Sequence, residues 1–297
     1  GVALIMAVLE SESLEHPRLE AAFTTAEEED LSGALSIDGA LFTARRMINI
    51  DHVADNEVVL GSCGGMAAEI ALPVEKVPLT GGHICRSVAL SGLPGGHSGE
   101  NIHCGNGNAI VLIGRILRRC EPLGALIADI SGGSFRTAIP REASVTVAVP
   151  RENGAAFEQM LEEIGREFKE EYLAAAPELR LSAAEAVASQ VLSASSTMRL
   201  IHALCLSPDG ISAMNDRMEH IVESSDNLGE LHLEENVCRI IYEIRSTYPS
   251  TASFIADKIA LIGELKPQVP VFADRAAGHL RRLILIGAQF RSFEPDP

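Results

Sequence analysis

Ala21-Ala22-Phe23-Thr24-Thr25-Ala26-Glu27-Glu28-Glu29-Asp30 is the stretch on which the fold prediction depends, because it passes from an apolar run into four acidic residues. A second apolar run, residues 47–50, ends in the same way at Asp51. In open α/β sheets the chemically active side chains lie beyond the carboxyl ends of neighbouring strands. We therefore predict two short strands that bring Glu27, Glu28 and Asp51 to one edge of a sheet. Their oxygens suit a metal ion and a base acting on its water. The alternative is a solvated acidic turn.

Composition limits the classes of protein to consider. The chain has 297 residues, enough for two domains, and its 46% hydrophobic content is ordinary for a globular protein. Its formal charge of −17 argues against a nucleic-acid partner or an anionic membrane surface, since binding phosphate requires clustered Lys and Arg. No apolar run reaches the roughly 18 residues that a membrane-spanning helix needs.

The six cysteines are scattered along the chain and include no C-x-x-C pair. This spacing favours neither a zinc ribbon nor a disulfide framework. We predict reduced thiols, as in a cytosolic protein.

Residues 1–68 alternate between helical and strand-like segments. We predict helices at 1–14 and 33–41, and a strand at 58–60 in addition to the two strands above. Alternation of this kind favours an α/β domain with a mostly parallel sheet and helices.

The pattern changes beyond about residue 69, where strand-like segments alternate with long helical ones. The helix predicted at 155–174 carries its apolar residues at i, i+3 and i+4 spacing, which indicates a core-facing stripe. Antiparallel strands with helices on one face predict an α+β domain. The other predicted helices are 108–119, 197–206 and 251–262, and the predicted strands are 88–90, 125–130, 143–149, 211–222, 237–246 and 268–272.

The segment Gly95-Gly96-His97-Ser98-Gly99 surrounds one imidazole with small residues. Glycines allow tight turns and the close approach of a ligand. His97 is therefore a candidate metal ligand, general base or donor to a developing oxyanion. A structural role is the alternative for a single histidine.

Two polar residues follow or end strand-like segments further along the chain. Arg245 ends the alternating segment 239–245, and a guanidinium forms two bonds to a carboxylate. Asn227 lies in Ser224-Ser225-Asp226-Asn227-Leu228-Gly229 and can offer an amide to a peptide-like group. Taken singly, each also fits an ordinary surface or turn position.

Together these motifs resemble the aminoacyl-histidine dipeptidases, the Xaa-His branch of the M20 metallopeptidases. The resemblance covers essentially the whole chain and rests on motifs that occur in the same order. They are Thr24-Thr25-Ala26-Glu27-Glu28, Asn49-Ile50-Asp51, Gly61–Gly65, Gly95–Gly99, Phe135–Ala143, Ser225–Gly229 and Ala288-Gln289-Phe290 with the tail to Pro297.

The resemblance implies zinc-dependent hydrolysis of Xaa-His dipeptides by a metal-activated water at a two-zinc site in a cytoplasmic enzyme. It also implies a partial α/β catalytic domain at 1–68, an inserted α+β lid domain at 69–268 and a return to the catalytic domain at 269–297. The substrate would be a small peptide, and a homodimer is compatible with the family. By motif, Glu27 corresponds to the general base, Glu28 and Asp51 to zinc ligands, His97 to the oxyanion-stabilising histidine, and Asn227 and Arg245 to residues that hold the dipeptide.

The chain also departs from the family pattern. Ala26 stands where an Asp is usual, and Asp30 where a Gly is usual. The family's remaining zinc ligands fall outside the matching segment, so we expect residues 1–297 alone to bind zinc poorly and to be inactive. Two alternatives remain: a sister M20 hydrolase (an aminoacylase, tripeptidase or carboxypeptidase), and a non-catalytic remnant used for dimerisation or binding.

Overall fold

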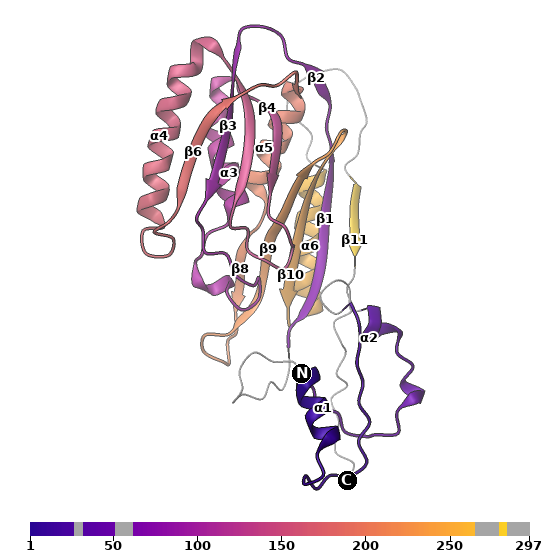
Figure 1. The fold of residues 1–297 in the computed structure, drawn as a ribbon. Coiled ribbons are helices and arrows are strands. Elements are labelled where there is room, and N and C mark those ends of the chain that lie inside the picture. The colour runs from indigo at the N-terminus through magenta and orange to yellow at the C-terminus, as the bar shows by residue number, and fades with distance from the viewer. Residues whose placement is uncertain (27–31, 51–61, 265–278, 284–297) are drawn as a thin grey trace. The chain divides into compact units, whose positions relative to one another are not determined.

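The structure, a computed structural model, describes residues 1–26, 32–50, 62–264 and 279–283 (Figure 1). The chain divides into two compact units, Gly1–Ser62 and Cys63–Pro297. Each unit is described by itself below.

The described part of Gly1–Ser62 contains short helices and no strand. It comprises α1 (Val2–Glu10), α2 (Ser32–Ser36) and a 3₁₀ turn at Gly39–Leu41. The helix predicted at 1–14 is present in shortened form, but residues 21–26 and 47–50 are not strands, so those two predictions are wrong. Met47 and Ile48 are 74% and 86% exposed, so no neighbouring strand buries the apolar run. The strand predicted at 58–60 lies outside the described residues.

Cys63–Pro297 is built on a nine-stranded sheet with the order β11-β1-β10-β9-β4-β5-β3-β6, and β8 pairs with β9 beside this path. A separate two-stranded sheet pairs β2 with β7. The strands are β1 (Gly64–Pro73), β2 (Lys76–Pro78), β3 (His83–Ser91), β4 (Leu126–Gly132), β5 (Ala143–Pro150), β6 (Arg180–Ala186), β7 (Gln190–Leu192), β8 (Gly210–Met214), β9 (Val222–Leu233), β10 (Val237–Ser246) and β11 (His279–Leu283).

All strand pairs of the described sheets are antiparallel. The mostly parallel sheet predicted for residues 1–68 is wrong for its described part: residues 1–26 and 32–50 form no strand, and residues 64–68 belong to β1, which pairs antiparallel with β10 and β11. The antiparallel pairing of β9 with β10 follows from the short turn between them, because neighbouring strands joined by a tight turn must run in opposite directions. The strand predicted at 211–222 is also wrong in detail: β8 and the beginning of β9 share that segment. The antiparallel sheet predicted beyond residue 69 is confirmed.

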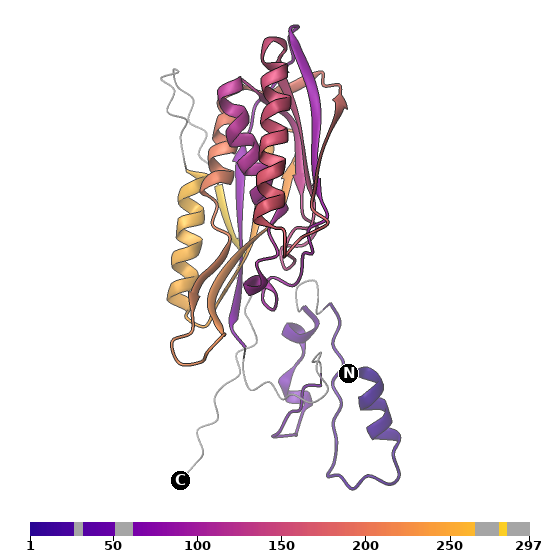
Figure 2. The same cartoon turned by 90° about the vertical axis from the view of Figure 1, so that its left-hand side faces the viewer.

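Four helices of this unit lie on one face of the sheet (Figure 2). They are α3 (Ala109–Cys120), α4 (Gly154–Glu171), α5 (Ala194–Leu206) and α6 (Pro249–Gly263), with 3₁₀ turns at Ile102–Cys104, Glu121–Leu123 and Arg151–Asn153. Asn108 caps α3 by accepting a hydrogen bond from the Ile110 amide at 2.9 Å. All four helices correspond to segments predicted as helical.

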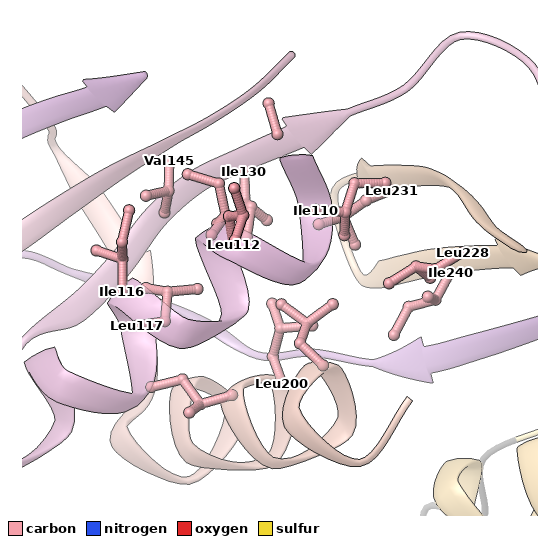
Figure 3. Packing of buried hydrophobic residues seen from close by; sticks show 14 of the residues in the cluster. Ile110, Leu112, Ile116, Leu117, Ile130, Val145, Leu200, Leu228, Leu231 and Ile240 are labelled. Carbon is pink, nitrogen blue, oxygen red and sulfur yellow. The ribbon is translucent and has the colours of Figure 1, made fainter. Parts of the chain in front are cut away.

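The core lies between these helices and the sheet. Ile110, Leu112 and Ile116 of α3 are fully buried, and they pack with residues of α5 and the strands (Figure 3). The stripe predicted on α4 is confirmed, because Phe157, Met160, Leu161, Ile164 and Phe168 are all buried. Since this face holds the hydrophobic core, the opposite face of the sheet is left for polar groups.

One carboxylate is buried on the helix-covered side. Asp226 of β9 is 2% exposed, and its Oδ2 accepts a hydrogen bond from Ser212 at 2.8 Å, while its Oδ1 has no hydrogen-bond partner among the described residues. Burial raises the pKa of Asp226, against the lowering effects of the Ser212 hydrogen bond and the Lys258 charge.

We expect Asp226→Asn to raise stability at pH 7 by about 1 kcal/mol. Because the pKa is raised on folding, the carboxyl's contribution is fully present below its unfolded value of 3.8 and is lost as pH rises through the folded pKa. The gain should therefore disappear near pH 4. Urea unfolding at both pH values measures it, with the exposed Asp216→Asn as control. An equal gain at both pH values would contradict this account.

Among the described residues, no helix is both long and apolar enough to cross a bilayer. All six cysteines are free thiols, as predicted.

Candidate functional site

A polar cluster occupies the face of the sheet opposite the helices. In the β9–β10 register Glu243 lies opposite Asn227, and Arg245 lies opposite Ser225. Directly opposite residues share a face, and their neighbours Tyr242 and Ile244 belong to the core on the other face. Glu243, Arg245 and Asn227 therefore point away from the helices.

Glu243 lies between two guanidinium groups. Its side chain is 6% exposed; Oε2 accepts from Arg136 Nε at 3.0 Å, and Oε1 lies 3.7 Å from Arg245 Nη2. Arg136 and Arg245 are themselves only 27% and 20% exposed. One buried carboxylate thus offsets part of two partly buried positive charges and leaves the trio with a net positive charge.

His97 belongs to a tightly hydrogen-bonded turn. Its backbone amide donates to Asn101 Oδ1 at 2.8 Å, and its Nδ1 accepts from the amides of Gly99 and Glu100 at 3.3 and 3.2 Å. The turn is attached to a second loop, because Ser98 N donates to the Thr137 carbonyl at 2.8 Å. The imidazole is exposed, but its ring orientation is defined by these contacts.

Arg245 joins this turn to the sheet. Its Nε donates to Ser98 Oγ at 3.3 Å, and its Nη2 lies 3.4 Å from His97 Nε2. Gly99 makes room for the contact, since a Cβ there would lie 3.2 Å from Arg245 Nε and 3.3 Å from His97 Cε1. The fold therefore brings together two predicted site residues that are 148 positions apart in the sequence.

Asn227, the third predicted site residue of this unit, is 1% exposed. Its Nδ2 donates to the backbone carbonyls of Arg136 and Ala138 at 2.8 and 2.9 Å, while its Oδ1 has no hydrogen-bond partner in the part of the chain that the structure describes. Ala138 pairs with His97 in an isolated β-bridge. Asn227 thus holds the loop that carries Arg136 and that supports the His97 turn.

Two polar residues of this cluster were not among the predicted site residues. Glu243 lies two positions before Arg245 on one strand, and the two-residue period of a strand places both on the same face. That signal was available in the sequence. Arg136 lies in the motif Phe135–Ala143, but its contact with Glu243 depends on the path of the loop from β4 to β5. No pattern in the neighbouring sequence predicts that contact.

The predicted base Glu27 and the predicted zinc ligands Glu28 and Asp51 lie outside the described residues. Within the described part of the chain, no three His, Cys, Asp or Glu side chains are grouped so that they could hold a metal ion. The described cluster consists of hydrogen-bonding groups and charged side chains.

We expect Glu243→Gln to lower the free energy of unfolding by about 1–3 kcal/mol, because it removes the charge that balances Arg136 and Arg245. Chemical denaturation measures the loss. The matched control is Glu234→Gln, because this carboxylate is 49% exposed in its ion pair with Arg239. Its loss should stay below about 1 kcal/mol. Equal losses in the two variants would contradict a buried-charge effect.

Comparison with known proteins identifies proteins to which this chain is similar. Residues 88–176 match the M20 peptidase dimerisation domain. The chain is 31% identical over 268 residues to the cytosol non-specific dipeptidase of Escherichia coli (strain K12), which covers 89% of this chain and 55% of that protein. These matches support the resemblance to the M20 peptidases. Its resemblance to the aminoacyl-histidine branch is thereby supported at the level of dipeptidases.

A solved structure agrees with this assignment. The crystal structure of aminoacylhistidine dipeptidase from Vibrio alginolyticus matches with a TM-score of 0.76 and 32% identity, over 95% of this chain and 56% of that one. The chain thus spans about half the length of these M20 dipeptidases.

Proposed function

We propose that the protein to which this chain belongs hydrolyses dipeptides, with Xaa-His dipeptides as the preferred class. The observation that carries the proposal is the approach of His97 Nε2 and Arg245 Nη2 to 3.4 Å on the polar face of the sheet. In a relative of M20 dipeptidases, such a pair suits the oxygens of a short peptide.

Glu27 is proposed as the general base, and Glu28 and Asp51 as residues that hold zinc. Carboxylates are among the side chains that zinc accepts as ligands. Two bound zinc ions would supply polarisation of the peptide carbonyl and a lowered pKa of water. Glu27 would accept the proton of that water and return it to the leaving amine.

The described residues would bind and orient the peptide. Arg245 offers its guanidinium to an oxygen of the substrate, and His97 offers its imidazole beside it. Asn227 acts mainly through the loop that it holds, because its Nδ2 is engaged by the carbonyls of Arg136 and Ala138. We further propose that residues 69–268 serve as a lid domain over a catalytic domain formed in part by residues 1–68 and 269–297, in a cytoplasmic enzyme.

We expect Glu27→Gln to lower kcat/KM by about 10²- to 10⁴-fold, since a general base contributes that much to a reaction rate. The assay uses zinc-supplemented protein carrying the segments that flank residues 1–297, and dipeptides with C-terminal His, Gly or Leu. Residues 1–297 alone are expected to show no turnover. The matched control, Glu29→Gln, removes a neighbouring acidic charge and should retain activity.

Full activity of Glu27→Gln would overturn the assignment of the base. Absence of dipeptide hydrolysis in the flanked protein, together with turnover of N-acyl amino acids, would favour a sister hydrolase of the same family.

We also propose a homodimer formed through residues 88–176, supported by the match of that segment to the M20 dimerisation domain. Light scattering should report twice the mass of the chain. Zinc titration of the protein that carries the flanking segments distinguishes an enzyme from a non-catalytic dimerisation module. A dimer that binds no zinc would favour the non-catalytic alternative.

A further inference from the structure

One edge of β9 changes its partner along its length. β8 pairs with β9 as far as the pair of Gly210 with Asp226, and β4 pairs with β9 from the pair of Gly132 with Leu231 onward. Between these two partners, no strand of the described residues pairs with Leu228 on this edge. Leu228 is fully buried, and a buried backbone N–H or C=O without a partner costs free energy. The gap between β8 and β4 therefore has to be filled by other groups.

Two side chains fill this gap. Asp209, the residue before β8, accepts a hydrogen bond from the Leu228 amide at 3.0 Å through Oδ1, and Asn108 Nδ2 donates to the Leu228 carbonyl at 2.9 Å. Asn108 Nδ2 also donates to Asp209 Oδ1 at 2.8 Å, so the two side chains bind each other as well. Together they make the hydrogen bonds that a neighbouring strand would otherwise make. We call Asp209 and Asn108 the Leu228 clasp.

The clasp holds β9 where its pairing with β10 is irregular, because the register skips Gly229. On one side of Leu228, Asn227 donates to the carbonyls of Arg136 and Ala138. On the other side, Gly229 lies so close to the same loop that a Cβ would be 2.4 Å from Arg136 Cα. Both neighbours of Leu228 thus contact the loop between β4 and β5.

The same loop is also held by the beginning of α3. Ala109, which directly follows the clasp residue of that helix, donates its amide to the Pro140 carbonyl at 3.1 Å. Within the loop, the Thr137 carbonyl accepts from the Ser98 amide at 2.8 Å. The clasp is therefore linked through β9 and through α3 to the loop that supports the turn of residues 95–99.

We propose that Asp209 and Asn108 are positioning residues, which hold Leu228 in the gap between β8 and β4 and so set the place where β9 receives the loop that carries Arg136. Neither side chain contacts the peptide in this account. The placing of the loop follows from the hydrogen bonds of the clasp, whereas its effect on peptide binding rests on the proposed function.

Hydrogen–deuterium exchange of the full chain, followed by mass spectrometry, tests the clasp without any catalytic activity. Asp209→Ala should speed exchange by about tenfold in peptides covering residues 225–231, the loss expected for one hydrogen bond to a charged group. Exchange should also rise in peptides covering residues 134–140, while α4 keeps its wild-type rate. Wild-type exchange at 134–140 would overturn the proposal, and so would an equal rise in α4, which would indicate a general loss of stability.

Two further variants identify the acceptor oxygen as the cause. Asp209→Asn keeps an oxygen at the position of Oδ1 and should retain wild-type exchange, since both hydrogen bonds need only an acceptor. Asp216→Ala removes a carboxylate that is 86% exposed in the link between β8 and β9, and it should change nothing. If Asp209→Asn exchanges as fast as Asp209→Ala, the hydrogen bonds of the clasp do not hold the loop and the proposal is wrong.

Asn108→Ser keeps the test valid if Asp209→Ala folds poorly. A serine retains an oxygen that can cap α3, but it lacks the amide that donates to the Leu228 carbonyl. This variant should reproduce the local rise in exchange at 225–231 and 134–140. Wild-type exchange in both segments would contradict the proposal.

The effect on peptide binding is measured in the zinc-supplemented protein that carries the flanking segments. Asp209→Ala should raise KM for a dipeptide by about tenfold and change kcat less, because it displaces groups that bind the peptide and leaves the proposed base in place. Asp209→Asn should keep the wild-type KM. An unchanged KM in Asp209→Ala would overturn the role of the clasp in the site. If exchange follows the expected pattern but the wild-type flanked protein cleaves no dipeptide, the proposed function fails while the positioning of the loop stands.

Discussion

Gly229→Ala is expected to destabilise the protein by about 3 kcal/mol or more, because the new Cβ would collide with backbone atoms. It would lie 2.4 Å from Arg136 Cα and 2.6 Å from the Arg136 carbonyl oxygen. Gly229 is the residue of β9 that the register with β10 skips, between Leu228 and Glu230. A glycine at a strand irregularity permits such close approach of another chain segment.

Urea unfolding followed by circular dichroism measures this loss. Gly81→Ala is the matched control, since a Cβ at Gly81 meets no atom within 4 Å and the loss there should be below about 1 kcal/mol. Gly133→Ala tests the packing of the same loop against β9, because its Cβ would lie 1.9 Å from the Gly229 carbonyl oxygen; the φ of +68° at Gly133 adds backbone strain to that loss. Wild-type stability in Gly229→Ala would show that this loop does not pack against β9 as described.

Asn227→Asp is the second change with a large expected effect. It replaces the amide that donates to two backbone carbonyls with a carboxylate that can only accept. At neutral pH a buried charge would then face two carbonyl oxygens, and we expect a loss of about 3 kcal/mol or more. Dipeptide affinity in the flanked protein should fall as well, since the loop carrying Arg136 would be displaced.

The pH dependence of this loss identifies its cause. Burial and the two carbonyls would raise the pKa of the introduced carboxyl above its value of about 3.9 in the unfolded chain. The stability deficit should therefore be smallest below about pH 4 and should grow as pH rises through the folded pKa. Asn236→Asp in the exposed turn before β10 is the control, with an expected change within about 0.5 kcal/mol. A deficit of the same size at every pH would indicate a packing effect.

The helices of the larger unit could be predicted because their cause is local. The apolar stripe of α4 repeats at helical spacing, and α3 begins at an asparagine cap. Some strands were predicted correctly and others were missed. β10 was predicted with its observed bounds, whereas β1 and β6 were missed because both are rich in Ala and contain Glu, residues that are depleted in strands.

The errors have a common physical reason. Residues 47–50 have strand-like composition, but a strand forms only when a partner supplies the other half of its hydrogen bonds and covers its side chains. Met47 and Ile48 are exposed, so this condition is not met. Parallel or antiparallel pairing is likewise a property of two segments, and the composition of one segment does not specify it.

By itself, the sequence determined the helices of Cys63–Pro297, the polar alternation of β10 and the resemblance to M20 dipeptidases that the comparisons support. It also identified His97, Asn227 and Arg245 as candidates. Only the tertiary structure decided that His97 Nε2 lies 3.4 Å from Arg245 Nη2, that Glu243 balances two arginines, and that two amides occupy His97 Nδ1. The reason is that periodicity and capping act over a few residues, whereas this site joins a turn, a loop and two strands that are brought together only when the sheet forms its pairs and the core behind it closes.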